Sequence, residues 1–170
     1  MHIIWRREKE FEDFIGAVAS KKIEPFGGLY VLIAVVESYF EFIARVLLDK
    51  IKLSEAEKKK WKHGNAINML AGKKRKLIDE EDKNILHEVG QLRNDMLHDI
   101  LYQPDLKRLK EFMQKSFNEK LDQADEHRCS SSPEKIESLF CAQVVTAYAK
   151  ISNKYKHKVD GKIADYLKNP

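Results

Sequence analysis

The chain has few of the residues that break helices or cross-link chains: 7 glycines, 4 prolines and 2 cysteines among 170 residues. A sheet-rich fold needs turn residues about every 8–12 positions, so this scarcity disfavours it. The two cysteines, Cys129 and Cys141, exclude a disulfide framework, and they lie at no metal-ligand spacing. We therefore expect a helical protein in a reducing, cytoplasmic compartment, with no metal and no cofactor.

Long hydrophobic runs are also missing. The apolar stretch Leu29–Val36 is too short to span a bilayer, and Glu37 and Glu41 interrupt its continuation. The N-terminus becomes charged directly after Trp5, so it lacks the apolar core of a signal peptide. The sequence thus predicts no membrane partner.

Hydrophobic residues make up 43% of the chain and charged residues 34%. This composition supplies a core and favours long helices with charged surfaces. Apolar periodicity predicts helices over residues 3–21, 29–51, 54–64, 65–77, 80–101, a segment after Pro104, and 134–157. Residues 129–132 are predicted as a loop, and Ser132 followed by Pro133 is typical of a helix start. The interpretation is one all-α domain over residues 1–170, an up-and-down helical bundle with a long C-terminal helix over about 133–158.

The net charge of +4 is unevenly distributed. Between Lys50 and Lys76, ten basic residues and two acidic ones give a local net charge of +8. The last four, Lys73, Lys74, Arg75 and Lys76, are candidate nucleic-acid ligands, because clustered cations are typical of polyanion binders. A solvated helix end explains the same run, since cations there complement the helix dipole. Both interpretations stay open on the sequence.

The helix predicted over 80–101 is the most informative segment. Its core stripe is Ile85, Val89, Leu92 and Met96, and a second line beside it is Leu86, Gly90, Arg93 and Leu97. A third line is polar and consists of His87, Gln91, Asn94 and His98. A solvated stripe explains His87 and Gln91, although they also extend the line that holds Asn94 and His98.

The segment Leu92-Arg93-Asn94-Asp95-Met96-Leu97-His98 carries the candidate chemical site. An Arg and a His at this spacing are common by chance; Asn directly after Arg, and the helical setting, make the pattern more specific. The segment resembles the hallmark of the HEPN superfamily, Arg-polar-x-x-x-His on an inner helix of a small bundle with a four-helix core. The similarity covers residues 30–101 and includes an acid, Glu37, on the earlier helix. Mannitol-operon repressor-like proteins are similar too, with a His-Asp pair matched by His98-Asp99, but they usually lack the Arg-Asn start.

The resemblance implies a homodimeric, metal-independent endoribonuclease, a toxin or defence effector with RNA as substrate and an antitoxin or regulatory protein as a further partner. His98 would accept a proton from the ribose 2′-hydroxyl, Arg93 would stabilise the phosphate, and Asn94 would orient His98 or contact the phosphate. Glu37 and Asp99 would support them. Three alternatives remain: Arg93 bridges to Glu37 and His98 pairs with Asp99 for structural reasons, the protein is a non-catalytic binding or regulatory module, or it is a purely structural interaction domain.

Overall fold

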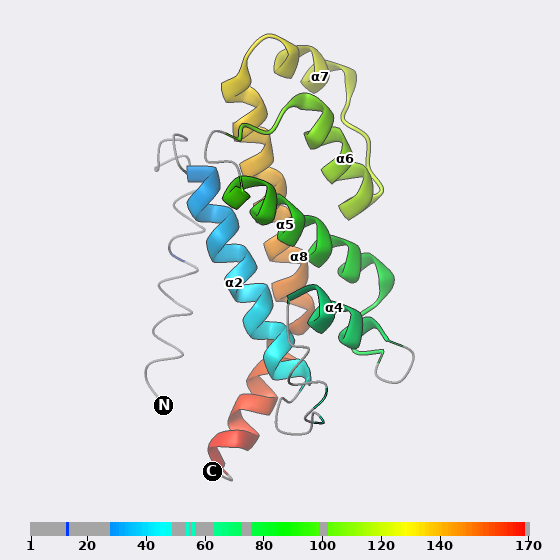
Figure 1. Ribbon diagram of the computed structural model, residues 1–170, viewed down its shortest axis with the longest axis vertical. Helices are drawn as coiled ribbons and strands as arrows, with labels where there is room; N and C mark the ends of the chain where they lie inside the picture. The colour runs from blue at the N-terminus through cyan, green and yellow to red at the C-terminus, as the bar shows by residue number, and fades with distance from the viewer. Residues whose placement is uncertain are drawn as a thin grey trace.

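A computed structural model describes residues 13, 28–48, 54, 56, 63–72, 76–98 and 102–168. Within these ranges the chain forms six α-helices and no strand (Figure 1). They are α2 (Gly28–Leu48), α4 (His63–Ala71), α5 (Glu80–His98), α6 (Leu106–Phe117), α7 (Gln123–Ser130) and α8 (Pro133–Lys168). The prediction of an all-α helical bundle is confirmed.

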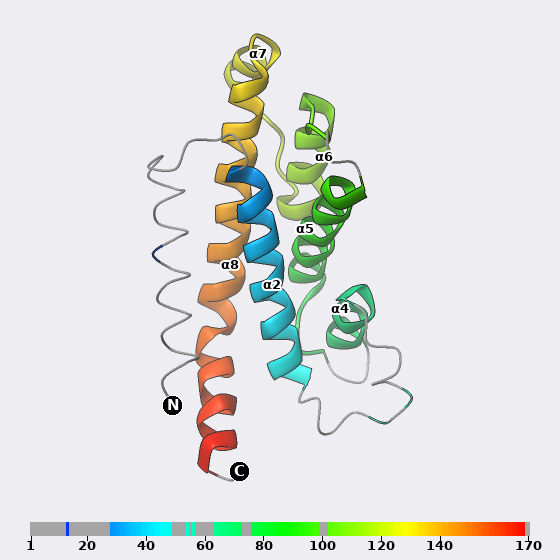
Figure 2. The same cartoon turned by 60° about the vertical axis from the view of Figure 1, so that its left-hand side comes forward.

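Helices α2 and α8 lie side by side and run in the same direction (Figure 2). Two hydrogen bonds fix their register: Tyr39 Oη and Ser152 Oγ are 3.0 Å apart, and Lys162 Nζ donates to the Leu47 carbonyl at 2.7 Å. The apolar surface of α2 is covered by α4, α5 and α8. This arrangement agrees with the prediction that this helix occupies the middle of the bundle.

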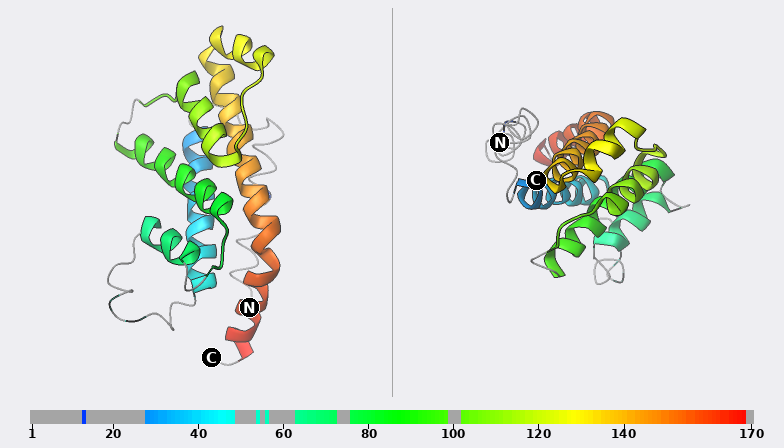
Figure 3. Two further views of the ribbon diagram at one scale, coloured as in Figure 1. Left: turned by 90° about the vertical axis from the view of Figure 1, so that its right-hand side faces the viewer. Right: turned by 90° about the horizontal axis from the view of Figure 1, so that it is seen from above.

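Helix α5 runs antiparallel to α2 and packs against α4 on one side and α6 on the other (Figure 3). Near its C-terminal end, Tyr30 Oη donates to the Met96 carbonyl at 2.9 Å. That bond satisfies one of the carbonyl groups that a helix leaves unpaired in its last turn. The end of α5 that carries the candidate site is therefore held against α2.

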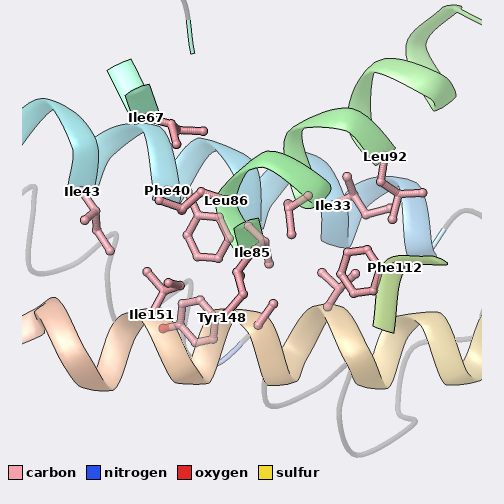
Figure 4. Close-up of a cluster of buried hydrophobic side chains, with 14 of the residues drawn as sticks. Ile33, Phe40, Ile43, Ile67, Ile85, Leu86, Leu92, Phe112, Tyr148 and Ile151 are labelled. Atoms are coloured by element: carbon pink, nitrogen blue, oxygen red, sulfur yellow. The ribbon is translucent and has the colours of Figure 1, made fainter. Parts of the chain in front are cut away.

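The core lies where α2, α5, α6 and α8 meet (Figure 4). The predicted stripe Ile85, Val89, Leu92 and Met96 is buried along its whole length. Around it pack Phe40 from α2, Phe112 from α6, and Tyr148 and Ile151 from α8. Each such side chain contributes about 1.5–3 kcal/mol when buried, so this stripe fixes how α5 is rotated.

Polar side chains hold the N-terminal end of α5 against α8. The carboxylate of Asp79 caps the helix by accepting a hydrogen bond from the Asp82 amide at 2.9 Å. Asp82 itself is fully buried; its carboxylate accepts a hydrogen bond from Tyr155 Oη and pairs with Lys154 Nζ at 2.7 Å. Glu81 pairs with Lys150 one turn earlier on α8. Burial, followed by the hydrogen bond to Asp82, raises the pKa of Tyr155.

Three boundary predictions were wrong. The loop predicted over residues 129–132 is confined to Ser131 and Ser132, because Cys129 is the buried residue of α7, whose N-cap is Asp122. The helix predicted over 65–77 ends at Ala71, and Lys76 has a left-handed backbone with φ 43° in the connection that follows. The last helix continues to Lys168, about three turns beyond its predicted end.

The predicted helices over 3–21 and 54–64 lie outside the described residues, apart from a few isolated positions. Among the helices that the structure describes, none combines the length and apolar character that crossing a bilayer requires. Cys129 and Cys141 are both free thiols. Burial raises the pKa of the Cys141 thiol to about 11, and the nearby Glu137 adds to the shift.

Candidate functional site

Arg93 lies on the flank of α5 that faces α2. Its Nε is 3.8 Å from Oε2 of Glu37, which is an ion pair without a direct hydrogen bond. The Glu37 side chain is 7% exposed, whereas the Arg93 side chain is 42% exposed. The buried carboxylate therefore orients the guanidinium while leaving much of it open to a ligand. The contact itself was among the sequence-based alternatives for Arg93.

Asn94 follows Arg93 on the exposed side of α5. Its Oδ1 accepts a hydrogen bond from Arg93 Nη1 at 3.4 Å. This contact uses the amide oxygen of an exposed side chain and not its amide nitrogen. Arg93 and Asn94 thus form one polar pair at the surface.

His98 is exposed at the C-terminal end of α5. It lies five positions after Arg93, which places the two side chains about 140° apart around the helix. Asn94, four residues before His98, shares its face. No hydrogen bond or ion pair to His98 is found among the described residues. The imidazole is therefore accessible, but one chain does not bring it beside Arg93.

Among the other predicted site residues, the structure describes Lys76 alone. Asp99, Lys73, Lys74 and Arg75 lie outside the described residues. Lys76 is exposed in the connection between α4 and α5 rather than at a helix end. The helix-dipole explanation therefore does not apply to Lys76, because α4 ends five residues earlier.

A charged network next to the motif was not anticipated. Arg108 of α6 donates to Oε2 of Glu88 at 2.9 Å, and its Nε lies 3.5 Å from Oδ2 of Asp95. Gln91 completes the set by donating to Asp95 Oδ1 at 2.7 Å. Burial by itself would lower the pKa of Arg108, but hydrogen bonding to Glu88 and the charges of both acids raise it overall. The network ties α6 to the side of α5 away from Arg93.

Two large apolar side chains are exposed, one on α5 and one on α2. Leu97 of α5 is 61% exposed and Val31 of α2 is 50% exposed, and they are the large hydrophobic residues of the described chain with this property. Leu97 lies one turn after Arg93, and Val31 lies beside Tyr30, which bonds to the last turn of α5. The pattern placed Leu97 next to the core stripe, and only the rotation of α5 shows it to be exposed.

The described residues contain no group of three or more His, Cys, Asp or Glu side chains arranged to hold a metal ion. A scan against protein-family models and searches of curated proteins and solved structures each found no match. The functional argument consequently rests on the motif and its geometry.

Proposed function

We propose that this protein is a metal-independent endoribonuclease of the HEPN type, acting as a homodimer. The supporting observation is the open C-terminal end of α5, where a buried Glu37 orients a half-exposed Arg93, and where Asn94 and His98 are exposed. The match of residues 92–98 to the HEPN hallmark links this geometry to RNA cleavage.

The chemistry follows from the residue types. A neutral imidazole at His98 accepts the proton of a ribose 2′-hydroxyl, and the resulting alkoxide attacks the adjacent phosphorus. Arg93, which stays charged at any physiological pH, stabilises the negative charge that develops on the phosphate oxygens. The bond from phosphorus to the 5′-oxygen breaks, and the leaving oxygen takes a proton from water while the imidazolium of His98 returns its proton to solvent, which leaves a 2′,3′-cyclic phosphate and a 5′-hydroxyl. None of these steps requires a metal ion.

A homodimer would bring together the Arg93 and His98 side chains that one chain keeps apart. Within one chain Arg93 and His98 are about 140° apart on the helix, so a single protomer does not direct both at one phosphate. Two-fold symmetry would place His98 of one protomer opposite Arg93 of its partner. The exposed Leu97 and Val31 would then lie near the contact, where their burial adds to its stability. A role as toxin or defence effector, with an antitoxin as partner, belongs to the same proposal.

The test is cleavage of total RNA in EDTA by wild type and by Arg93→Ala and His98→Ala. Wild type should cleave, and each variant should lose about 10²- to 10⁴-fold in rate, the usual contribution of a general base or a charge-stabilising group. Matched controls are Arg128→Ala and His127→Ala, an exposed Arg and His on α7, which should retain full activity. Inert wild-type protein would refute the proposal.

A non-catalytic binding or regulatory module remains the second candidate, favoured by the separation of Arg93 and His98 within one chain. It predicts that His98→Ala binds RNA and supports function as wild type does, while charge reversal of the 73–75 cluster abolishes both.

A further inference from the structure

The exposed face of α5 carries a stripe of uncharged hydrogen-bonding side chains at spacings of three and four residues: Asn84, His87, Gln91, Asn94 and His98. The carboxylates in this part of the helix, Glu88 and Asp95, lie on the neighbouring flank, where Arg108 neutralises them. In a chain with 34% charged residues, an ordinary solvated face would carry Lys and Glu. We call these five residues the amide stripe, after its three amide side chains. Its lack of charged side chains needs another explanation.

The amide stripe leads from His98 to a cavity between α5 and α6 of about 350 Å³. The residues that line it all carry polar or charged groups: Asn84, His87, Glu88, Gln114, Lys115 and Asn118. The volume falls within the range of about 300–1,000 Å³ that is typical of small-ligand sites. The stripe and the cavity share Asn84 and His87, so they form one continuous polar surface.

The chemistry of the cavity suits a nucleobase. Three of its residues are amides, and an amide carries both a donor and an acceptor, the combination that pairs with the edges of bases. Gln114 Nε2 donates to Asn118 Oδ1 at 2.7 Å, which leaves the amide oxygen of Gln114 and the amide nitrogen of Asn118 for a base. His87 offers an aromatic face for stacking, and its Nε2 lies 3.3 Å from Asn68 Oδ1 of α4, which orients the ring. The Glu88 carboxylate forms ion pairs with Arg108 and, at 3.6 Å, with Lys115. A phosphate therefore meets no unpaired carboxylate there.

The spacing suits a single strand of RNA. His87 and His98 are eleven residues apart, which is about 16 Å along a helix. At about 3.4 Å per stacked nucleotide this corresponds to about five nucleotides, and to fewer in an extended strand. We infer that single-stranded RNA follows the amide stripe away from the Arg93–His98 end, and that one base, a few nucleotides from the cleaved bond, enters the α5–α6 cavity and sets sequence preference. This inference rests on the proposed function for its ligand class.

The test measures binding of short 2′-O-methyl oligonucleotides of A, C, G or U, which lack the nucleophilic hydroxyl and are not cleaved. Wild type should prefer one base, and the double variant Asn84→Ala/Gln114→Ala should lose that preference with about tenfold weaker binding to the preferred oligonucleotide. The matched control is Asn153→Ala/Gln123→Ala, an exposed Asn and Gln on α8 and α7, which should bind as wild type does.

Gln114→Glu provides a second variant should the double variant fold poorly. It keeps the shape of the side chain and sets a negative charge beside the bound strand, so a comparable loss is expected. Equal binding of all four oligonucleotides by wild type, or an unchanged preference in the cavity variants, would overturn the inference. Mononucleotides that bind as tightly as the oligonucleotides would overturn it too, because the cavity would then be a site for free nucleotides.

The outcome is separable from that of the proposed function. His98→Ala should lose cleavage and keep the base preference, whereas the cavity variants should keep kcat and raise KM for the preferred RNA. A wild-type protein that shows the cavity-dependent preference without cleaving RNA refutes the nuclease and leaves the binding site. Cleavage without any base preference refutes the binding site alone.

Discussion

The two ends of α5 differ in how they are attached to the rest of the molecule. At the N-terminal end, Asp82 is buried between Tyr155 and Lys154 of α8, and Asp79 caps the helix. At the C-terminal end, a hydrogen bond from Tyr30 and the ion pairs of Arg93 with Glu37 and of Asp95 with Arg108 hold the helix, and Asn94 and His98 are exposed. The same helix is thus anchored at one end and open at the other.

Along α5, the side chains that stabilise the fold are therefore separated from those proposed to carry the chemistry. Buried polar groups are costly to disturb, because a partner left behind loses its hydrogen bond without regaining water. Exposed side chains outside such networks change stability by only about 0.5 kcal/mol when substituted. Substitutions at the anchored end should therefore lower the free energy of unfolding, whereas those at Asn94 or His98 should affect function and leave the fold intact.

The largest expected effect on stability is at Asp82. Asp82→Ala removes the acceptor of the buried Tyr155 hydroxyl and a partner of Lys154, and should cost about 3 kcal/mol. Urea unfolding followed by circular dichroism measures the change. Asp125→Ala, at a side chain of α7 that is 36% exposed and pairs with the exposed Arg128, serves as the comparison and should cost far less. Similar costs for the two would mean that the buried cluster does not anchor α5.

The second-largest effect on stability is expected from the ion pairs that link α5 to α6. Arg108→Met leaves Glu88 and Asp95 without their main cation, and Lys115 compensates only part of the loss. We expect a cost of about 2 kcal/mol in unfolding free energy, below that of a fully isolated buried pair. Arg128→Met, with a side chain 69% exposed, is the matched control. A larger loss in the control would show that the network contributes little.

A smaller effect, with a pH signature, is expected at Asp79. Its pKa is lowered, first by the hydrogen bond from the Asp82 amide and then by the one from Lys154. Because the folded-state pKa lies below the unfolded value of about 3.9, the stabilisation is present above that pH and is lost as the pH falls through the folded-state pKa. Asp79→Ser retains a capping oxygen without the charge, so it should cost under about 1 kcal/mol at neutral pH.

The pH dependence is the sharper part of that prediction. The stability difference between wild type and Asp79→Ser should shrink on acidification and disappear below the folded-state pKa. A difference that stays constant between neutral and acid pH would show that the charge of Asp79 contributes nothing.

The smallest effect on the fold is expected at Leu97. Because this side chain is 61% exposed, Leu97→Ser should change unfolding free energy by about 0.5 kcal/mol or less when the protein is dilute. If Leu97 lies in the dimer contact, the same change should weaken self-association in sedimentation experiments. A matched change at the other exposed hydrophobic residue, Val31→Ser, tests whether the contact includes α2. Unchanged association in both variants would place the dimer contact elsewhere.

The accuracy of the sequence-based predictions depended on the kind of sequence pattern behind each of them. The stripe from Ile85 to Met96 was predictable because a periodic apolar pattern directly specifies which face is buried. Helix α7 has only one buried residue, Cys129, and so carries almost no periodic signal; its Asp122 cap was the clue that remained.

Polar pairings were harder to predict than the fold. Arg93 and Glu37 were named together because both fall in the motif resemblance, and the structure places them in contact. The pairing of Arg108 with Asp95 depends on how α5 and α6 are rotated against each other, which no local pattern encodes. The exposure of Leu97 depends on the same rotation.

The most direct test of the proposed chemistry uses one defined RNA in EDTA, with the ribose on the 5′ side of the cleaved bond replaced by 2′-deoxyribose. If His98 activates the 2′-hydroxyl, wild type should cleave the all-ribose strand to a 2′,3′-cyclic phosphate and a 5′-hydroxyl, identified by mass spectrometry, and should leave the substituted bond intact. Cleavage of the substituted bond, or products with a 5′-phosphate, would contradict the account.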